Sequence, residues 1–305
     1  MLSNSVPPNT SYTHDVDNRL LTAGEISFGY DDNGSLITKT LGTNVTNYSW
    51  DFNDMLTQVT ANGNTYVYRY DALGNRVAKV VNSVETRYVR SLAETDVSGN
   101  ITTYYIYGLG LISKITPANE SYFYHFDGIG STVAITDSSG NVVNKYAYDE
   151  HGKVLNQEEA ISNPFKYVGR FGVMDEGNGL LYMRARFYDP EIGRFISKDP
   201  IGFAGGDLNL YAYVANNPIN NIDPQGKIID KLAIIGAFAS LVAITAGFVN
   251  NLFDVTHPPE AIDPSCDDAL QEWLRKDPPK VGARPPTIYR GPPQDTRPPT
   301  IQTPR

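Results

Sequence analysis

The feature of this sequence that most constrains its fold is an aromatic residue followed by Asp, which recurs every 20 residues at Tyr30-Asp31, Trp50-Asp51 and Tyr70-Asp71. Each Asp opens a short turn, and similar turns begin at Asp127 and Asp149. Asp at the first turn position accepts backbone N–H bonds, and Gly at the fourth position tolerates positive φ. The pattern therefore predicts a series of β-hairpin tips.

The runs between these turns alternate in the way that strands do. Thr65–Tyr70 and Ile101–Tyr107 carry aromatic side chains on one or both faces of an extended chain. Two strands and a turn cannot bury a face by themselves, so neighbouring hairpins must share one sheet. We predict a mainly β fold, a spiralling antiparallel sheet of hairpin repeats. The tyrosines are assigned to packing, and an aromatic ladder that binds sugars is the alternative.

Composition excludes several classes of function. The formal net charge of −9 has the wrong sign for a nucleic-acid surface, so we expect no nucleic-acid binding by the body of the protein. The single cysteine, Cys266, excludes an internal disulfide. The four histidines share no metal-ligand spacing and no phosphate-binding loop motif occurs, so the sequence predicts no metal and no cofactor.

The chain changes character after Gly226. Leu232–Phe253 has no charged residue and, as a helix, is long enough to span a bilayer. A transmembrane helix is the first interpretation, and a hydrophobic helix buried in protein is the second. From residue 257 proline is frequent and Arg-Pro-Pro-Thr-Ile occurs twice, which predicts a disordered or polyproline tail.

One part of the chain carries a dense set of motifs. They are Tyr124–Ser131, Lys166–Arg170, Gly179–Pro190, Ile192–Gly202, Asn209–Tyr213, Asn216–Pro218 and Asp223–Gly226. Together they resemble the RHS repeat-associated core, and the period-20 turns upstream resemble the YD repeats that precede this core.

The resemblance implies a β-shell that carries a variable C-terminal region, usually a toxin, in bacterial competition or insecticidal systems. It also implies that an aspartyl-protease-like activity in the core cuts the chain just after the DPxG motif. The cleavage-site residues would be Gly226, Lys227 and Ile228, and the Lys227–Ile228 bond would be the one cut. The enzyme activity expected is at most this self-cleavage.

Such chemistry needs two carboxylates, one acting as a base toward water and the other as an acid. Asp199 and Asp207 are our candidate pair, with Arg194 nearby in sequence to orient or tune them. Asp223 belongs to the motif at the cut and is the alternative to Asp207. For each of these residues a purely structural role in a turn is the competing interpretation.

The sequence departs from the family at two places. The residue after the DPxG motif is usually apolar, whereas here it is Lys227, whose ammonium group is costly to bury. The repeats are also few for a closed shell, so we expect an open sheet edge and an upstream shell segment as a partner. The chain would then be a fragment of a split or truncated gene.

These observations divide the chain into an irregular segment 1–19, YD-type hairpins 20–121, an RHS core 122–227, a hydrophobic helix 228–256 and a Pro-rich tail 257–305. The function expected is that of a toxin fragment that acts on membranes through residues 232–253 and is released by self-cleavage. The alternative is a non-enzymatic structural, surface-binding or carbohydrate-binding repeat protein.

The family further implies an immunity protein and a secretion-system component as partners. Met1–Thr10 lacks a basic region followed by an apolar run, so a bacterial, secreted or membrane-associated protein would use a non-Sec route.

Overall fold

The computed structural model describes residues 11–89 and 92–231. The chain divides into two compact units, Met1–Thr245 and Ala246–Arg305, and all the described residues belong to the first. The predicted hydrophobic helix and Pro-rich tail lie outside the described residues, apart from the short stretch 228–231. Within residues 11–89 and 92–231, no helix is long and apolar enough to cross a membrane.

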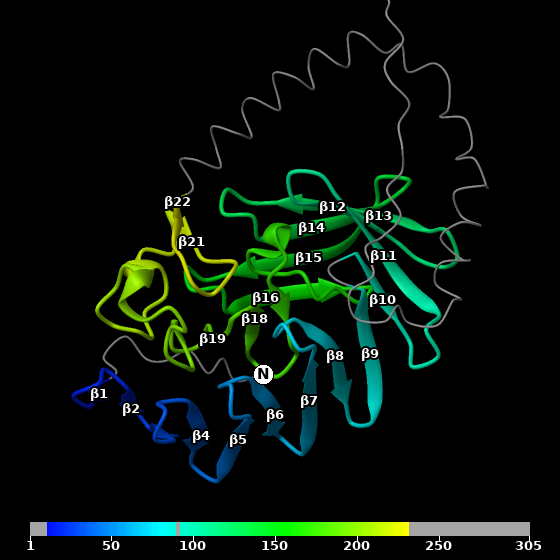
Figure 1. The fold of residues 1–305 in the computed structure, drawn as a ribbon. Coiled ribbons are helices and arrows are strands. Elements are labelled where there is room, and N and C mark those ends of the chain that lie inside the picture. The colour runs from blue at the N-terminus through cyan, green and yellow to red at the C-terminus, as the bar shows by residue number, and fades with distance from the viewer. Residues whose placement is uncertain (1–10, 90–91, 232–305) are drawn as a thin grey trace, which may run out of the picture. The chain divides into compact units, whose positions relative to one another are not determined.

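A 16-stranded antiparallel sheet forms most of the described structure, and its strands follow one another in sequence order (Figure 1). The prediction that each strand pairs with its sequence neighbours is confirmed. The strands are β1 (Tyr12–His14), β2 (Leu20–Ala23), β3 (Ile26–Tyr30), β4 (Leu36–Leu41), β5 (Asn44–Trp50), β6 (Leu56–Ala61), β7 (Asn64–Tyr70), β8 (Arg76–Val81), β9 (Val84–Val89), β10 (Ala93–Thr95), β11 (Ile101–Tyr107), β12 (Leu111–Ile115), β13 (Ser121–Phe126), β14 (Thr132–Asp137), β15 (Val142–Tyr148) and β16 (Val154–Glu159).

The sheet extends across residues 19–20 and 121–122, where two domain boundaries were predicted from sequence. It begins before residue 20, because β1 pairs with β2, and it continues without a break through residues 121 and 122, because β12 pairs with β13. Strands β1 and β16 each have one neighbour among the described strands, so the sheet is open with two edges.

The Asp turns have the predicted hydrogen bonds. Asp71 Oδ1 accepts the backbone N–H groups of Leu73 and Asn75, both at 2.9 Å, and Gly74 closes the turn at φ 80°. Asp127 and Asp149 make the same pair of bonds to the residues two and four positions on. These turns form from local bonds, which explains why the sequence alone reveals them.

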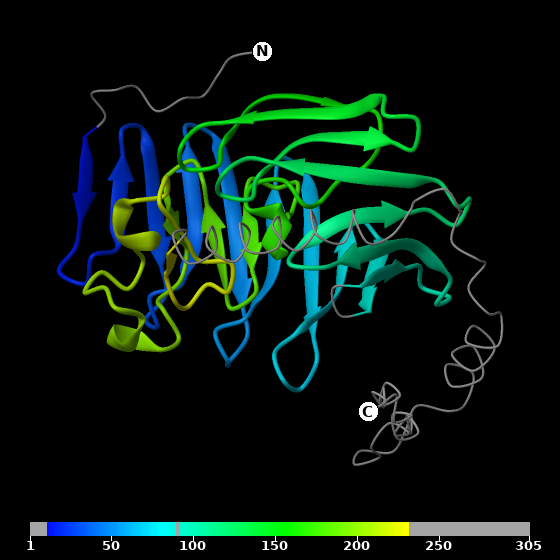
Figure 2. The same cartoon turned by 90° about the horizontal axis from the view of Figure 1, so that it is seen from above.

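A β-bulge follows many of these turns and bends the sheet. The register between β7 and β8 shifts at Arg69 and Tyr70, and the pairs β3–β4, β5–β6, β13–β14 and β15–β16 shift in the same way. A bulge adds local twist to a strand and bends it. Repeated along the sheet, these bends turn one face inward, as Figures 1 and 2 show.

The chain from residue 160 to residue 231 packs against this inner face. It has few regular elements, which are η1 (Gly169–Phe171), β17 (Met174–Asp175), β18 (Leu181–Met183), β19 (Arg186–Asp189), β20 (Arg194–Phe195), η2 (Gly202–Gly205), η3 (Val214–Asn216), β21 (Asn221–Ile222) and β22 (Asp230–Lys231). We call residues 160–231 the inner segment. Most of the dense motifs found in the sequence lie in this inner segment. They therefore specify the chain that packs inside the sheet as well as the last strands of the sheet itself.

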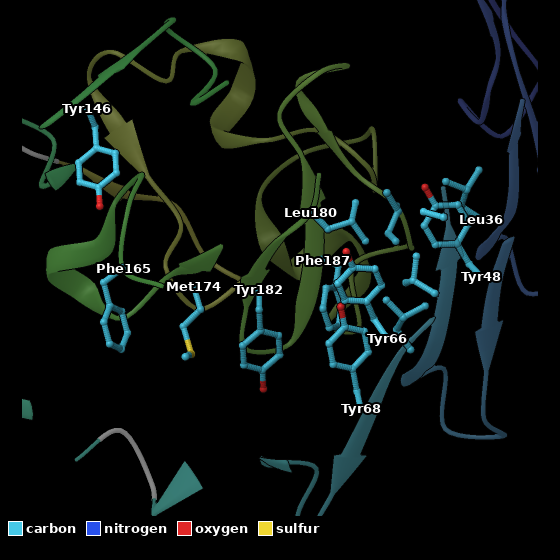
Figure 3. Packing of buried hydrophobic residues seen from close by; sticks show 14 of the residues in the cluster. Leu36, Tyr48, Tyr66, Tyr68, Tyr146, Phe165, Met174, Leu180, Tyr182 and Phe187 are labelled. Atoms are coloured by element: carbon cyan, nitrogen blue, oxygen red, sulfur yellow. The ribbon is translucent and has the colours of Figure 1, made fainter. Parts of the chain in front are cut away.

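Aromatic side chains join the sheet to the inner segment (Figure 3). Tyr68 on β7 packs against Phe187 with ring centroids 5.1 Å apart, and Tyr105 on β11 packs edge-to-face against Phe165 at 4.9 Å. Burying each such ring stabilises the fold by roughly 1.5–3 kcal/mol. The tyrosines on the inner face are therefore core residues and cannot form an open sugar-binding ladder; they are Tyr48, Tyr66, Tyr68, Tyr105, Tyr124 and Tyr146, each at most 8% exposed.

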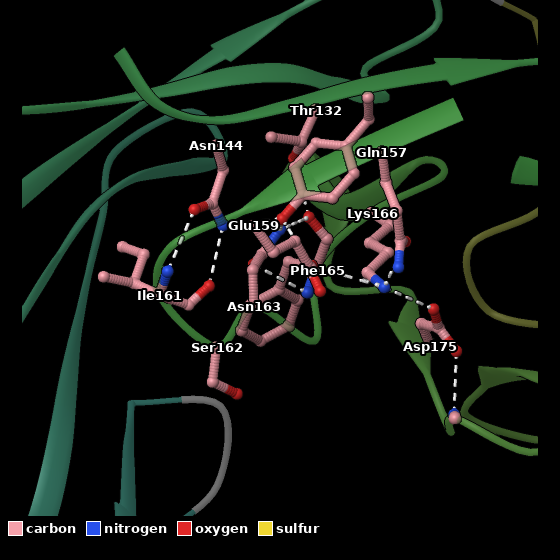
Figure 4. Close-up of polar contacts among 12 residues, drawn as sticks. Thr132, Asn144, Gln157, Glu159, Ile161, Ser162, Asn163, Phe165, Lys166 and Asp175 are labelled. Atoms are coloured by element: carbon pink, nitrogen blue, oxygen red, sulfur yellow. Dashed lines mark hydrogen bonds and ion pairs between the residues drawn. The ribbon is translucent and has the colours of Figure 1, made fainter. Parts of the chain in front are cut away.

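Polar contacts fix the start of the inner segment against the last strands of the sheet (Figure 4). The buried Asn144 accepts the backbone N–H groups of Ala160 and Ile161 at 3.0 and 3.1 Å and donates to the Ile161 carbonyl. Lys166 forms ion pairs with Glu159 on β16 and with Asp175 on β17, at 3.3 and 3.0 Å. The chain that leaves β16 is therefore held beneath the sheet.

Candidate functional site

A tight hairpin grips the segment that contains the predicted cut. Strands β18 and β19 are joined by the two residues Arg184 and Ala185. Arg184 Nη1 donates to the Pro224 carbonyl at 2.7 Å, and the Ala185 N–H donates to the Gln225 carbonyl at 3.2 Å. Arg186 Nε donates to the Gly226 carbonyl at 2.6 Å. Three successive carbonyls are thus held by three successive residues of the hairpin.

Gly226 is the residue that allows this close approach. Its φ is +64°, a conformation that residues with a side chain adopt at a cost. A β-carbon at this position would stand 2.5 Å from the Met183 carbonyl oxygen and 3.0 Å from the Arg186 nitrogen, both of which are backbone atoms. The glycine of the Asp-Pro-Gln-Gly motif is therefore required by packing as well as by the turn.

Arg186 is the centre of the site. Its side chain is 3% exposed, and its guanidinium carbon lies 3.5 Å from the centroid of the Phe195 ring. Nη2 contacts Asp199 Oδ2 at 2.9 Å and Asp223 Oδ2 at 3.3 Å. Burial lowers the pKa of Arg186, while the two carboxylates act against that shift. One arginine thus joins two aspartates to the backbone at the predicted cut.

Asp223 also contacts the peptide groups on both sides of Lys227. Its Oδ1 accepts the N–H of Lys227 at 3.0 Å and the N–H of Ile228 at 3.2 Å. The residue is 2% exposed, and this burial raises the pKa of its carboxyl group, with backbone hydrogen bonds and Arg186 opposing the shift. A carboxyl group is therefore in contact with the nitrogen that a cut of the Lys227–Ile228 bond would release.

Asp199 lies on the other side of Lys227. The Asp199 Oδ2 atom and the Lys227 carbonyl oxygen both border Gly205, at 2.7 and 3.1 Å from the position that a β-carbon of residue 205 would take. A cavity of about 10 Å³ lies here, lined by Arg186, Asp199, Asp223 and Lys227 among others. A cavity of that size has room for roughly one water molecule.

Two of the residues proposed from sequence are placed differently. Asp207 borders the same small cavity, but its carboxylate accepts the N–H of Asn209 at 2.8 Å, and among the described residues Asp199 and Asp223 are the ion-pair partners of Arg186. Arg194 Nη2 lies 3.5 Å from Asn209 Oδ1, and its guanidinium faces the Tyr211 ring. The arginine that contacts Asp199 is therefore Arg186 and not Arg194.

Closeness in sequence was a poor guide to which arginine contacts Asp199. Arg194 is five positions from Asp199, but β20 and the chain that follows it direct the two side chains to different partners. The pairing of β19 with β20 brings Arg186 near the chain that leads to Asp199, and the hairpin's bonds to the carbonyls of residues 224–226 bring it near Asp223. The one sequence signal of Arg186 is its place in the dense motif Gly179–Pro190, because Arg184 and Ala185 form the turn of the hairpin and Arg186 is the first residue of β19.

Lys227 is exposed, so its ammonium group is not buried in the described structure. The residue borders the small cavity and also a larger one of about 630 Å³, whose wall includes Asp71, Tyr182 and Arg184. The larger cavity is not where the carboxylates converge, and we assign it no chemistry. Because the hairpin grips backbone carbonyls, the position of the chain does not depend on the side chain of residue 227.

The comparison with known families agrees with this architecture. The model of the Teneurin YD-shell family matches residues 3–219, which is more than half of the chain. The chain is an RHS/YD-repeat shell protein. The predicted family membership is confirmed, and the sheet and inner segment are the shell wall and the core of this family member.

Relatives of this shell protein include much longer chains. It is 39% identical over 241 residues to the tRNA nuclease WapA of Bacillus subtilis strain 168, an alignment that covers 74% of this chain and 10% of WapA. It is 30% identical over 251 residues to double-stranded DNA deaminase toxin A of Burkholderia cenocepacia strain H111, covering 68% of this chain and 17% of the relative.

A solved structure has the same fold. The crystal structure of TcdB2-TccC3 superposes on this shell protein with a TM-score of 0.51 and 19% sequence identity, covering 71% of this chain and 16% of that chain. The shell protein thus spans a small part of each relative.

Proposed function

We propose that this chain is a shell fragment of a bacterial polymorphic toxin and that it cuts itself between Lys227 and Ile228. The observation that carries the cleavage proposal is the pair of carboxylates, Asp199 and Asp223, joined by Arg186 on either side of residue 227. The toxin proposal is supported by the names of relatives such as WapA and the deaminase toxin.

In the proposed reaction Asp199 is the base and Asp223 the acid. Asp199, ion-paired with Arg186 at 2.9 Å, would take a proton from a water molecule in the small cavity. The oxygen of that water attacks the Lys227 carbonyl carbon. Asp223, whose pKa is raised by burial, gives its proton to the Ile228 nitrogen 3.2 Å away. The C–N bond breaks, leaving a carboxyl group on Lys227 and an amine on Ile228.

The assignment follows from the different environments of the two carboxyl groups. An acid must hold its proton near the operating pH, and burial favours the neutral form of Asp223. A base must be ionised, and the shorter of the two Arg186 contacts is the one to Asp199. In this proposal Asp207 is a turn residue, because its carboxylate caps the N–H of Asn209.

Intact-mass measurement over days at neutral pH tests the cleavage proposal. We expect the 33.6 kDa chain to be replaced by a fragment that ends at Lys227 and one that begins at Ile228. Asp199→Asn should abolish the cut, and Asp207→Asn, the matched control, should leave it. An Asp199→Asn chain that is cut at an unchanged rate would remove Asp199 from the mechanism.

The part of the chain after the cut would be the variable region, and we propose that it acts on membranes through residues 232–253. The support is the uncharged sequence of that stretch. Expressing residues 228–305 in bacteria and following membrane potential tests this. The absence of both depolarisation and a growth defect would contradict the proposal. An immunity protein, a secretion-system component and an upstream shell segment are the partners that such a toxin would need.

The second candidate function is a structural or surface-binding shell without enzyme activity. The observation in its favour is the open sheet with edge strands β1 and β16. An intact chain after prolonged incubation, with no product that ends at Lys227, would support this function.

A further inference from the structure

We propose that Gly205 is a positioning residue for the cut. Because residue 205 has no side chain, the carboxylate of Asp199 can face the carbonyl of Lys227 across the small cavity. This role rests on the proposed self-cleavage. It adds a requirement to the pair of carboxylates, namely that the chain beside the water site carries no β-carbon.

The backbone at residue 205 does not require glycine. Gly205 is the last residue of the 3₁₀ helix η2, and its φ lies outside the left-handed region. The next residue, Gly206, ends the helix at φ +91°. A residue with a side chain is favoured over glycine in a helical conformation, whereas a left-handed helix end favours glycine. The turn therefore explains the glycine at 206, and the glycine at 205 has another cause.

The hydrophobic core does not require glycine at 205 either. Helix η2 has no buried residue, and Phe203 is 69% exposed. The loop is instead closed around Asp199. The Asp199 N–H donates to the Leu210 carbonyl at 3.0 Å, and Asp199 Oδ1 accepts the N–H of Ile201 at 3.0 Å. This part of the chain therefore encloses a carboxylate and does not fill a core.

A β-carbon at residue 205 would collide with the proposed base. It would stand 2.7 Å from Asp199 Oδ2, which is closer than real β-carbons come to another atom. The carboxylate would have to turn away. Its Oδ1 is bonded to the N–H of Ile201 and its Oδ2 to Arg186, so a turn disturbs both contacts. Alanine at 205 would therefore displace the group that is proposed to activate water.

The same β-carbon would narrow the water site. The position of this carbon is 3.1 Å from the Lys227 carbonyl oxygen, so the carboxylate and the carbonyl both border one point beside Gly205. Gly205 is also part of the lining of the cavity of about 10 Å³. A cavity that holds roughly one water molecule has no room for an added methyl group as well. The missing side chain thus keeps the path from Asp199 to the carbonyl open.

Gly205 and Gly226 act in different ways. A β-carbon at 226 would meet backbone atoms of the hairpin, whereas among the described residues the one atom within 3.0 Å of a β-carbon at 205 is the end of the Asp199 side chain. A carboxylate can move without moving the backbone. Alanine at 205 should therefore leave the fold and the hairpin's hydrogen bonds in place and change the position of the base.

Intact-mass time courses of the full chain at pH 7 test this role, with near-UV circular dichroism to check folding. The Gly205→Ala chain should be cut about 100-fold more slowly than the parent, the loss expected when a reacting group is misplaced by about 1 Å. Gly128→Ala is the matched control, because Gly128 also has φ outside the left-handed region and nothing lies within 4 Å of its β-carbon position. The control should stay within about threefold of the parent rate. A folded Gly205→Ala chain that is cut at the parent rate would overturn the proposal.

Urea denaturation in two uncut backgrounds identifies the group through which Gly205 acts. Asparagine at 199 keeps an atom where Oδ2 stands, so adding Gly205→Ala to Asp199→Asn should lower the urea midpoint. Alanine at 199 removes that atom, so adding Gly205→Ala to Asp199→Ala should leave the midpoint unchanged or raise it. An equal fall in both backgrounds would mean that residue 205 acts on the loop and not through residue 199, and the positioning role would be wrong.

The outcomes separate this role from the self-cleavage itself. A parent chain that stays intact contradicts the proposed self-cleavage and the role of Gly205 together. A parent chain that is cut, beside a Gly205→Ala chain that is cut equally fast, contradicts the role of Gly205 alone.

Discussion

Arg76 on strand β8 and Glu176 in the inner segment form a buried ion pair across 100 residues of sequence. Their side chains are 1% and 0% exposed. The Arg76 guanidinium also lies 4.0 Å from the centroid of the Tyr182 ring, and Lys79 contacts Glu176 from the same strand at 3.3 Å. The ion pair ties the sheet to the inner segment, and the Arg76–Tyr182 contact ties it to β18, the first strand of the hairpin that holds the candidate cleavage site.

Replacing Arg76 by Met should therefore destabilise the protein strongly. Glu176 would keep its buried charge with Lys79 as its remaining partner, and breaking a buried pair costs about 3–5 kcal/mol. Urea denaturation of an uncut Asp199→Asn chain measures the change. Arg69→Met, at a pair in which the Arg69 side chain is 57% exposed, is the control and should cost at most about 1 kcal/mol. Equal effects of the two changes would contradict the role given to Arg76.

We expect the cleavage rate to depend on Arg186 and not on Arg194. Arg186→Gln removes the charge shared by Asp199 and Asp223, and we expect the cleavage rate to fall by about 100-fold or more, as when a catalytic hydrogen-bond donor is lost. Arg186→Lys should recover part of the rate, since it restores the charge without the geometry. Arg194→Gln should stay within about threefold of the parent chain, because its contacts are to Asn209 and Tyr211.

Intact-mass time courses give these rates, and near-UV circular dichroism checks that each variant is folded. A folded Arg186→Gln chain that cleaves at the parent rate would exclude Arg186 as a positioning residue.

Gly226→Ala should block cleavage, because it displaces the chain from its hydrogen bonds to the β18–β19 hairpin. The new β-carbon would meet the Met183 carbonyl oxygen at 2.5 Å, at a φ of +64°. Gly63→Ala is a suitable control, because Gly63 has φ +76° and open space around it. The control should cost about 1–2 kcal/mol of stability and leave the cut intact. Intact mass and urea denaturation of both variants separate the two effects, and equal cleavage of both would contradict the grip.

The cut should depend on pH through Asp223. Its carboxyl pKa is raised by burial, and the protonated form is the proposed acid, so the rate should fall as pH rises through that raised value. Time courses between pH 3 and pH 8, followed by intact mass, give the profile. A rate that rises steadily with pH would contradict the assignment of Asp223 as the acid.

The raised pKa of Asp223 should also make the stability of the fold depend on pH. A carboxyl group whose pKa is higher in the folded state contributes stability below its ordinary pKa of 3.8, and that contribution is lost as pH rises through the raised value. Comparing Asp199→Asn with the Asp199→Asn/Asp223→Asn double variant in urea at several pH values isolates this contribution from cleavage.

Sequence alone determined the features that arise from short-range bonds. An Asp that caps the N–H groups two and four residues later, as Asp71 does, and a Gly with positive φ, such as Gly74, are visible in a five-residue window. Because each turn reverses the chain, neighbouring strands must pair, and the order from β1 to β16 follows. The segment that contains the proposed cut was recognised through the family resemblance, which rests on motifs such as Asp223–Gly226.

The tertiary structure alone decided which residues meet inside the sheet. The bulges that bend the wall each depend on one extra residue, and their sum determines where the inner segment rests. The Arg186–Asp223 and Arg76–Glu176 pairs join residues 37 and 100 positions apart. No local pattern encodes such a contact, because it depends on how two separate elements pack. The local sequence therefore determines the turns. The packing of β19 against β20 determines that Arg186, and not Arg194, contacts Asp199.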